Sequence, residues 1–438
     1  MHPVSLPMVG TLLAGLIVIV LLARLLGLVA RALDQPPVIG EIIGGILLGP
    51  TLFHGAITST LFPSAVRPSL TTLANIGICA FTFLVGLEFD RNLLRGQGRL
   101  AVSVSLCGVV LPFGLGALLA VYLMGNHPTQ HRLAFVLFLG TAMSITAFPV
   151  LARILTDRGL INTPIAGLAL AAAAVEDVIA WSMLAVVVAL AGVNGHPWRV
   201  VLVIPFVALM LWVVRPLLAR LPLQFRRTGP VASVVVLIGV CAGVFLSAGA
   251  TGWMGLHLIF GAFLFGIAMP REGASPVREH AVRWIQGTCT ILLLPVFFMV
   301  AGLRVDLSKV DLTAMGELVL ILLVAIGGKF VGAFVGAGLN GLRFRHSAVL
   351  AILINTRGLT ELIVLTVGIQ IGLLDPSLGS LMIVMAVVTT TMTGVLLRLT
   401  QLIRTDVAES GPIPATSVLI NLPTRTTHRR GGRAGRRG

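Results

Sequence analysis

The chain has 438 residues, of which 57% are hydrophobic and only 11% charged, and its formal net charge is +15. Soluble proteins carry about 25% charged residues, so this composition excludes a soluble multidomain enzyme. The positive charge does not indicate a nucleic-acid partner, because eight of the 31 Lys and Arg residues follow residue 397, mostly in a Gly/Arg-rich end. We expect the bilayer to be the chain's surroundings, and we expect no nucleic acid and no cofactor.

Apolar runs of 18 or more residues predict membrane-spanning helices. Thirteen spans are expected, near 5–31, 37–53, 68–88, 100–124, 133–156, 163–193, 198–219, 230–249, 251–270, 284–303, 313–342, 346–372 and 377–400. The first run is expected to remain as a span, because the residues before it lack the basic region of a signal peptide. The expected fold class is therefore an all-α polytopic membrane protein. A membrane transport domain (1–404) precedes a cytosolic tail (405–438) that is expected to be largely disordered.

Basic residues set the expected orientation. Alternate loops, counted from the one after the first span and including the tail, hold 24 Lys and Arg residues, whereas the opposite loops hold five. Cytoplasmic loops carry the excess of Lys and Arg. We therefore expect a multi-pass protein of the cell membrane with the N-terminus outside and the tail in the cytoplasm.

Ionisable residues at bilayer depth are costly and are functional candidates by default. If Thr163 caps the sixth span, Asp177 lies about 21 Å along it, and Lys329 lies about 21 Å from the inner end of the eleventh. An acid and a base at matching depth are expected to pair. Glu176 either pairs with Lys329 or forms a second titrating group beside Asp177.

The fifth and twelfth expected spans are interrupted near their midpoints. The midpoint of 133–156 holds Pro149 and the hydroxyl residues Thr141, Ser144 and Thr146. The midpoint of 346–372 holds Gly358 and the polar residues Asn355, Thr356, Arg357, Thr360 and Glu361. A pair of broken segments in corresponding positions of two halves indicates a transporter binding site. The hydroxyl groups either line an ion site or bond their own backbone. Arg357 and Glu361, one turn apart, are expected to hold the broken helix.

A buried carboxylate can hold a proton or a small cation, and competition between the two, combined with alternating access, makes an exchanger. Asp177 is the expected carrier. An organic-anion symporter, a channel and an intramembrane enzyme are the alternatives. The acid–base pair argues against the first, no filter-like sequence supports the second, and no HExxH motif supports the third.

Seven stretches resemble the monovalent cation:proton antiporter family 2, in particular its plant cation/H⁺ exchanger branch. They are QPPVIGEIIGGILLGPTLF (35–53), ANIGICAFTFLVGLEFD (74–90), TAMSITAFPVLARIL (141–155), AAAAVEDVIAW (171–181), LLPVFFMVAGLRVDL (293–307), GGKFVGA (327–333) and NTRGLTELIVL (355–365). The resemblance implies a sodium/proton antiporter fold with inverted repeats and two crossed discontinuous helices. It also implies a homodimer with a dimerisation domain and a mobile core domain.

For the site, the resemblance implies that Asp177 binds the ion, that Thr146 is a ligand of the monovalent cation and that Lys329 forms a salt bridge. It implies exchange of K⁺ or Na⁺ for protons, and it favours K⁺. The pair Glu176-Asp177 departs from the Asp-Asp and Asn-Asp pairs of the family. Some relatives end in a large regulatory domain, which is not expected after a tail of this length.

Overall fold

The computed structural model describes residues 6–33, 35–52, 55–88, 98–157, 160, 163–191, 197–224, 230–269, 276–308 and 311–399. Every regular element in these ranges is helical, as the composition predicts. The expected cytosolic tail, 405–438, lies outside the described residues.

The helices of the first half follow the expected order. They are α1 (Leu6–Ala32), α2 (Pro37–Leu48), α3 (Ala56–Leu61), α4 (Arg67–Glu88), α5 (Gly98–Leu123), α6 (Arg132–Ser144), α7 (Phe148–Asp157) and α8 (Pro164–Leu190). A linking span follows, made of α9 (Val203–Leu209), a π turn (Met210–Val214) and α10 (Arg215–Gln224). The short helix α3 was not predicted from the sequence.

The second half completes the thirteen expected spans. Its helices are α11 (Pro230–Trp253), α12 (Leu258–Ala268), α13 (Pro276–Thr288), α14 (Leu294–Gly302), α15 (Leu312–Leu339), α16 (Phe344–Ile354), α17 (Leu359–Gln370) and α18 (Pro376–Leu399). Nine helices in the described residues are long and apolar enough to cross a membrane. The four other expected spans correspond to α2, α12 and the broken pairs α6/α7 and α16/α17, so the two predicted interruptions are confirmed.

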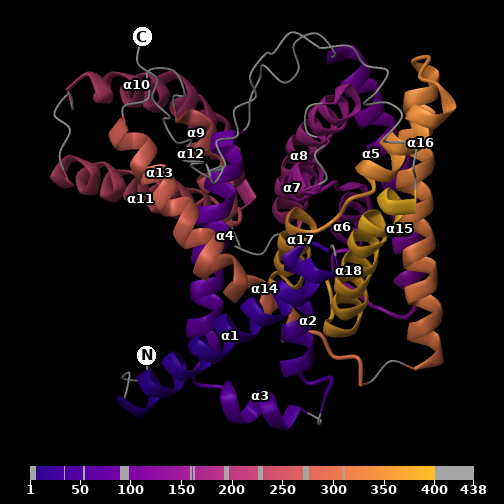
Figure 1. The fold of residues 1–438 in the computed structure, drawn as a ribbon, viewed down its shortest axis with the longest axis horizontal. Coiled ribbons are helices and arrows are strands. Elements are labelled where there is room, and N and C mark those ends of the chain that lie inside the picture. The colour runs from indigo at the N-terminus through magenta and orange to yellow at the C-terminus, as the bar shows by residue number, and fades with distance from the viewer. Residues whose placement is uncertain are drawn as a thin grey trace, which may run out of the picture.

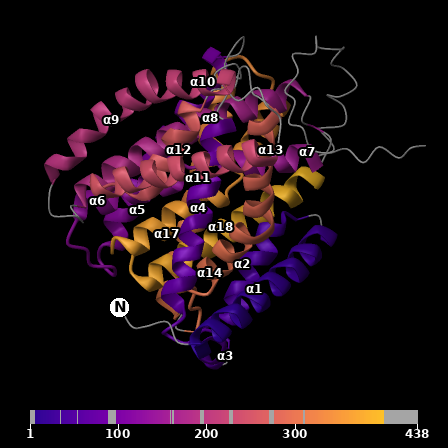
Figure 2. The ribbon, with the colours of Figure 1, turned by 90° about the vertical axis from the view of Figure 1, so that its left-hand side faces the viewer.

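The helices pack into two bundles, which lie side by side in Figure 1. The flanking bundle contains α1, α2, α4 and α11–α14, and α9–α10 reaches it through α12. Figure 2 shows α1, α9 and α11 across its outer face. The site bundle contains α5–α8 and α15–α18. Helix pairs within a bundle have many contacts, whereas α2 with α18 is the main helix pair in contact between bundles in the described part of the chain.

Contacts of the first half recur in the second half seven spans later. The pair α1–α2 corresponds to α11–α12, α2–α14 to α12–α4, α5–α6 to α15–α16, and α5–α8 to α15–α18. Because seven is odd, corresponding spans cross the bilayer in opposite directions. The architecture is therefore an inverted repeat, as predicted.

Two reciprocal pairs of glycines let backbones touch at equivalent places in the repeats. A Cβ atom on Gly45 would lie 2.3 Å from the Met299 carbonyl oxygen, and one on Gly302 would lie 2.4 Å from the Ile42 carbonyl oxygen. At the equivalent contact of α4 with α12, a Cβ on Gly86 or on Gly266 would lie 2.2 Å from a facing carbonyl oxygen. Side chains do not fit at these distances, so α2–α14 and α4–α12 pack through glycine.

A polar cluster joins three segments at the end of the site bundle where α5 ends and α15 begins. The His127 ring contacts Asp375 (Nδ1 to Oδ2, 2.5 Å) and Glu317 (Nε2 to Oε2, 3.0 Å). Asn126 donates from Nδ2 to the other Glu317 oxygen at 2.7 Å. The hydrogen bond to Asp375, opposed by burial and assisted by Glu317, raises the pKa of His127 from 6.5 to about 9.

This cluster predicts a pH-dependent stability. Since the pKa of His127 is higher in the folded chain than in the unfolded chain, its contribution is fully present below about pH 6.5 and is lost as the pH rises through about 9. In detergent, the melting temperature of the wild type should fall between these pH values more steeply than that of His127→Gln. The exposed His131, replaced by Gln, is the matched control and should retain the wild-type slope. Equal slopes for the wild type and His127→Gln would contradict the assignment.

Candidate functional site

Helix α8 carries the two adjacent acids to the middle of the site bundle. It begins as the sequence predicts, because the Thr163 side chain accepts a hydrogen bond from the Ala166 backbone N–H and Pro164 occupies the first helical position. Thirteen and fourteen residues after Thr163, Glu176 and Asp177 are 1% and 3% exposed. Two ionisable groups with almost no solvent contact require partners nearby.

Lys329 pairs with Glu176 and not with Asp177. The Nζ atom of Lys329 lies 2.7 Å from Glu176 Oε2, and both side chains are fully buried. This corrects the expectation that Lys329 pairs with Asp177, and it selects the salt-bridge alternative for Glu176. Neighbouring residues on a helix point about 100° apart, so only one of the two carboxylates faces α15.

Two backbone carbonyl groups complete the surroundings of Lys329. Its ammonium group donates to the carbonyl oxygen of Gly108 in α5, at 3.2 Å, and to the carbonyl oxygen of Ser144 at the end of α6. The sequence did not single out Gly108, because a carbonyl acceptor leaves no side-chain signal. A Cβ atom on Gly108 would lie only 3.0 Å from Glu176 Oε1, so a larger residue would crowd the pair.

The two helix interruptions cross at this level. The Thr146 hydroxyl donates to the carbonyl oxygen of Ile354 at 2.7 Å, and the Ala147 N–H donates to the carbonyl oxygen of Thr356 at 2.9 Å. The linker of α6/α7 is thus bonded to the linker of α16/α17. The C-terminal ends of α6 and α16, which carry partial negative charge, therefore lie close together inside the protein.

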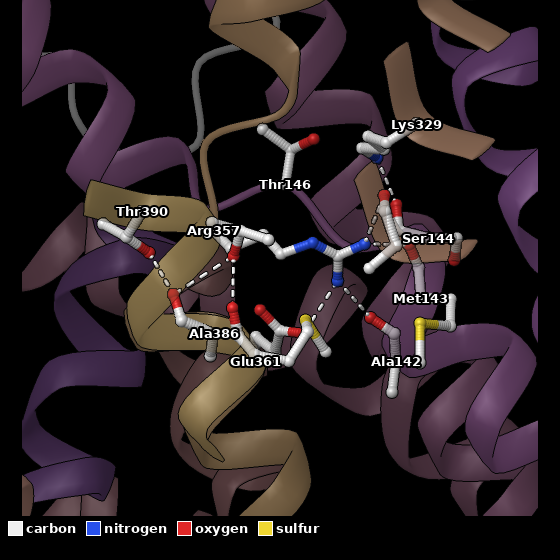
Figure 3. Close-up of polar contacts among 12 residues, drawn as sticks. Ala142, Met143, Ser144, Thr146, Lys329, Arg357, Glu361, Ala386 and Thr390 are labelled. Atoms are coloured by element: carbon white, nitrogen blue, oxygen red, sulfur yellow. Dashed lines mark hydrogen bonds and ion pairs between the residues drawn. The ribbon is translucent and has the colours of Figure 1, made fainter. Parts of the chain in front are cut away.

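Arg357 holds this crossing from within the second linker. As Figure 3 shows, its guanidinium group extends across the gap to the end of α6. It donates to the carbonyl oxygens of Ala142 (2.9 Å) and Met143 (2.5 Å). It also forms an ion pair with Glu361, 2.7 Å away and one turn further along the chain. Arg357 and Lys329 together therefore bond the last three carbonyl groups of α6.

Gly358 makes the turn that places Arg357. Its φ of +148° lies in a region that side chains disfavour, and it caps the start of α17. A Cβ atom there would also lie 2.9 Å from the Val150 side chain of α7. The sequence interpretation of Gly358 as the break point is consistent with this geometry.

Asp177 differs from the other buried acids because it lacks a cation partner among the described residues. Its Oδ1 atom is buried and has no hydrogen-bond partner in the described part of the chain. Thr360 of α17 lies close enough to interact with the carboxylate. The sequence places Thr360 at this helix break but does not predict it as a ligand, because its proximity to Asp177 depends on how α17 packs against α8.

The remaining site candidates lie at the same crossing of the two helix interruptions, but they differ in whether their side chains form hydrogen bonds. The Ser144 hydroxyl donates to the Thr141 carbonyl at 2.8 Å within α6, which is the self-bonding alternative. Asn355 and Thr356 are at most 1% exposed. Both amide atoms of Asn355 and the Thr356 hydroxyl have no partner among the described residues. Buried oxygen atoms of this kind are suitable ligands for a small hard cation.

The chain belongs to the sodium/hydrogen exchanger family. The family model described as "Sodium/hydrogen exchanger, transmembrane" matches residues 17–401, which is most of the chain. Together with the helices long enough to cross a bilayer, this makes the chain a multi-pass membrane protein.

Several characterised proteins are similar in sequence. The Na(+)/H(+) antiporter NhaS4 of Synechocystis is 36% identical over 87% of this chain and 95% of its own length. Cation/H(+) antiporter 20 of Arabidopsis thaliana is 38% identical over 86% of this chain, and K(+)/H(+) antiporter 1 of Saccharomyces cerevisiae is 31% identical over 90%. The matched region spans 46% of the plant and yeast proteins.

A solved structure shares the fold. The sodium proton antiporter MjNhaP1 of Methanocaldococcus jannaschii superposes with a TM-score of 0.62 and covers 91% of this chain and 99% of its own. The sequence identity is 17%. The likeness therefore concerns the fold, which agrees with the inverted repeat and the two broken helices described above.

Replacing Arg357 should destabilise the region where the two helix interruptions cross. Arg357→Met leaves Glu361 buried without a cation and leaves two carbonyl groups without donors, and breaking a buried pair in this way costs about 3–5 kcal/mol. We expect a large drop in the melting temperature measured in detergent. The double variant Arg357→Met/Glu361→Met should recover part of the loss. If the double variant is less stable than the single variant, the ion pair is not the reason for the loss.

Proposed function

We propose that the protein exchanges a monovalent cation, K⁺ or Na⁺, for protons, and that both bind at Asp177. The observation that carries the proposal is the contrast between the two adjacent acids. Glu176 is bound to Lys329, whereas Asp177 is buried with one oxygen unpartnered among the described residues. Relatives named as Na(+)/H(+) and K(+)/H(+) antiporters support the same activity.

Charge balance supports competition at one site. Three buried carboxylates, those of Glu176, Asp177 and Glu361, meet two buried cations, Lys329 and Arg357. Lys329 pairs with Glu176 and Arg357 with Glu361, so the ionised site retains one negative charge, at Asp177. One proton or one monovalent cation neutralises that charge, and both together would leave the site positive. Low-dielectric surroundings make either imbalance costly.

The cation would be held by oxygen atoms at the helix crossing. Thr146 and Thr360 approach the acids from the two broken spans, and Ser144, Asn355 and Thr356 lie at the same breaks. We propose Asp177 and Thr146 as ligands of the monovalent cation, with Glu176 and Ser144 lining the site. Lys329, Arg357 and Glu361 support it by neutralising the helix ends and each other.

Alternating access would arise from movement between the two bundles. The site bundle contains all of these residues, and its contacts with the flanking bundle are few by comparison with the contacts inside each bundle. A shift of the site bundle would carry Asp177 from one side to the other as a unit. The flanking bundle, with exposed apolar side chains on α1, α9 and α11, would form the dimer interface and the lipid contact.

The proposed orientation follows from the basic loops, with the N-terminus outside and the C-terminal end in the cytoplasm of the cell. In this orientation α6 and α17 lie in the outer half of the membrane, and α7 and α16 in the inner half. The polar cluster around His127 then faces the outside.

Replacing Asp177 tests the carrier. Asp177→Asn keeps the shape of the side chain but cannot exchange a proton for a cation, so cation-driven collapse of a pH gradient in proteoliposomes should fall to the rate of empty liposomes. The assay compares Na⁺, K⁺ and choline, which also identifies the ion. Asp311→Asn is the matched control, because Asn caps a helix as well as Asp does and Asp311 is exposed at the start of α15. Exchange at the wild-type rate by Asp177→Asn would overturn the proposal.

Replacing Lys329 tests the charge balance. Lys329→Met leaves three carboxylates with one cation, which favours protonation of the acids. The acid limb of the exchange rate against pH should therefore move to higher pH by more than ~1 unit. Lys329→Arg retains the charge and should show a smaller shift. An unchanged acid limb in Lys329→Met would show that Lys329 does not act on the titrating group.

A further inference from the structure

Lys329 uses all of its hydrogen-bonding capacity on three different elements. A lysine ammonium group has three N–H donors. They are directed to Glu176 Oε2, to the Gly108 carbonyl oxygen and to the Ser144 carbonyl oxygen. Two of the three acceptors are therefore backbone carbonyl groups, which in a helix interior are normally occupied by the N–H four residues later.

Each of these two carbonyl groups lies where a helix cannot supply that N–H. Ser144 is the last residue of α6, so its carbonyl group has no donor in its own helix. Gly108 lies in the interior of α5, but the residue four positions later is Pro112, which has no N–H. The proline therefore leaves the Gly108 carbonyl oxygen free inside an otherwise continuous helix.

A second proline in the chain shows the same relationship at a distant place. Pro295 follows a π turn, Cys289–Leu293, and the carbonyl oxygen four residues before it belongs to Ile291. That oxygen accepts a hydrogen bond from Arg24 Nη2 at 3.2 Å. In both cases a basic side chain from another helix bonds the carbonyl group four residues before a proline, although Ile291 lies in a π turn, where the helical donor is the N–H five residues later.

Close packing brings Lys329 to this acceptor. A Cβ atom on Gly328 would lie 3.0 Å from Pro112 Cα, and one on Gly332 would lie 2.5 Å from the Cys107 carbonyl oxygen. The two glycines, which lie on either side of Lys329 in the sequence, thus place the backbone of α15 directly against the proline segment of α5. This packing role is the one that the sequence spacing of the glycines favours.

We propose that Pro112 and Gly108 are positioning residues for Lys329: the proline frees the glycine carbonyl group, and this carbonyl holds the ammonium group on Glu176 and away from Asp177. The effect of this positioning on transport rests on the proposed cation/proton exchange, whereas the positioning of Lys329 itself does not. Gly108 contributes a second feature, since its missing side chain leaves room for the Glu176 carboxylate.

Pro112→Ala tests the positioning of Lys329 through the pH dependence of the exchange rate. Alanine restores the helical N–H, which takes the Gly108 carbonyl, so the charged form of Lys329 loses one acceptor. The alkaline limb of the exchange rate should move about one pH unit lower, the equivalent of a tenfold change in the protonation equilibrium. Alanine is favourable in a helix interior, so the variant should fold. Pro295→Ala is the matched control and should leave the limb unchanged. An unchanged limb in Pro112→Ala would overturn the proposal.

A double-mutant cycle of melting temperatures tests the same positioning of Lys329 without measuring transport. Pro112→Ala is measured in the wild type and in Lys329→Met. If the proline acts through Lys329, the substitution should raise the melting temperature more in the Lys329→Met background than in the wild type, because there no ammonium group loses its acceptor. Equal changes in both backgrounds would overturn the proposal. If the wild type shows no exchange but the cycle shows coupling, the proposed function fails and the positioning role stands.

Gly108→Ala gives an independent test of the space beside Glu176. The new Cβ atom would meet Glu176 Oε1 at 3.0 Å and force the carboxylate to shift. The exchange profile should change, whereas Gly114→Ala on the same helix, where nothing lies within 4 Å, should not change it. Identical profiles for the two alanine variants would show that Gly108 does not position the pair.

Discussion

The site depends on one constraint, the meeting of two helix C-termini in the middle of the membrane-spanning region. The ends of α6 and α16 bring unpaired carbonyl groups and partial negative charge to a place without bulk water. Arg357 and Lys329 bond the carbonyl groups of α6, and the Thr146 hydroxyl bonds that of Ile354. The two buried cations in turn require Glu361 and Glu176. Asp177 is the acid that remains after these pairs are formed, so the negative charge to which we assign the transported ion is a consequence of how the helix ends are neutralised.

Much of this arrangement was predictable because charges are conspicuous in an apolar chain. Thr163, the two helix breaks and the ionisable residues were each identified from residue type and position alone. The choice of Glu176 over Asp177 as the partner of Lys329 was not predictable. The two acids differ by only ~1.5 Å in depth, and the direction in which each points depends on how α8 packs against α5 and α15. Gly108 was missed for a related reason, since its contribution is a carbonyl group, which every residue has.

The inverted repeat explains why both halves of the chain share the same devices. Each half supplies a broken helix to the crossing, and each supplies one of the two long helices, α5 and α15, that pack against each other at its side. The halves are not equivalent in chemistry. The adjacent acids lie on α8 of the first half, whereas both buried cations lie in the second half, on α15 and in the linker before α17. An ion at the crossing would therefore be held by groups from both repeats, although the fold relating them is symmetric.

The reciprocal glycines of the flanking bundle have a mechanical consequence. At Gly45–Gly302 and Gly86–Gly266 the main chains of neighbouring helices touch directly, so neither pair can slide by one residue without driving a side chain into a facing carbonyl group. Such contacts fix the position of each helix along the axis of its neighbour. The same kind of contact occurs at two equivalent places, so both helix pairs of the flanking bundle are held in this way. These contacts favour a flanking bundle that stays rigid along its helices, so the proposed movement of the site bundle would take place at the boundary between the bundles, where fewer helices are in contact.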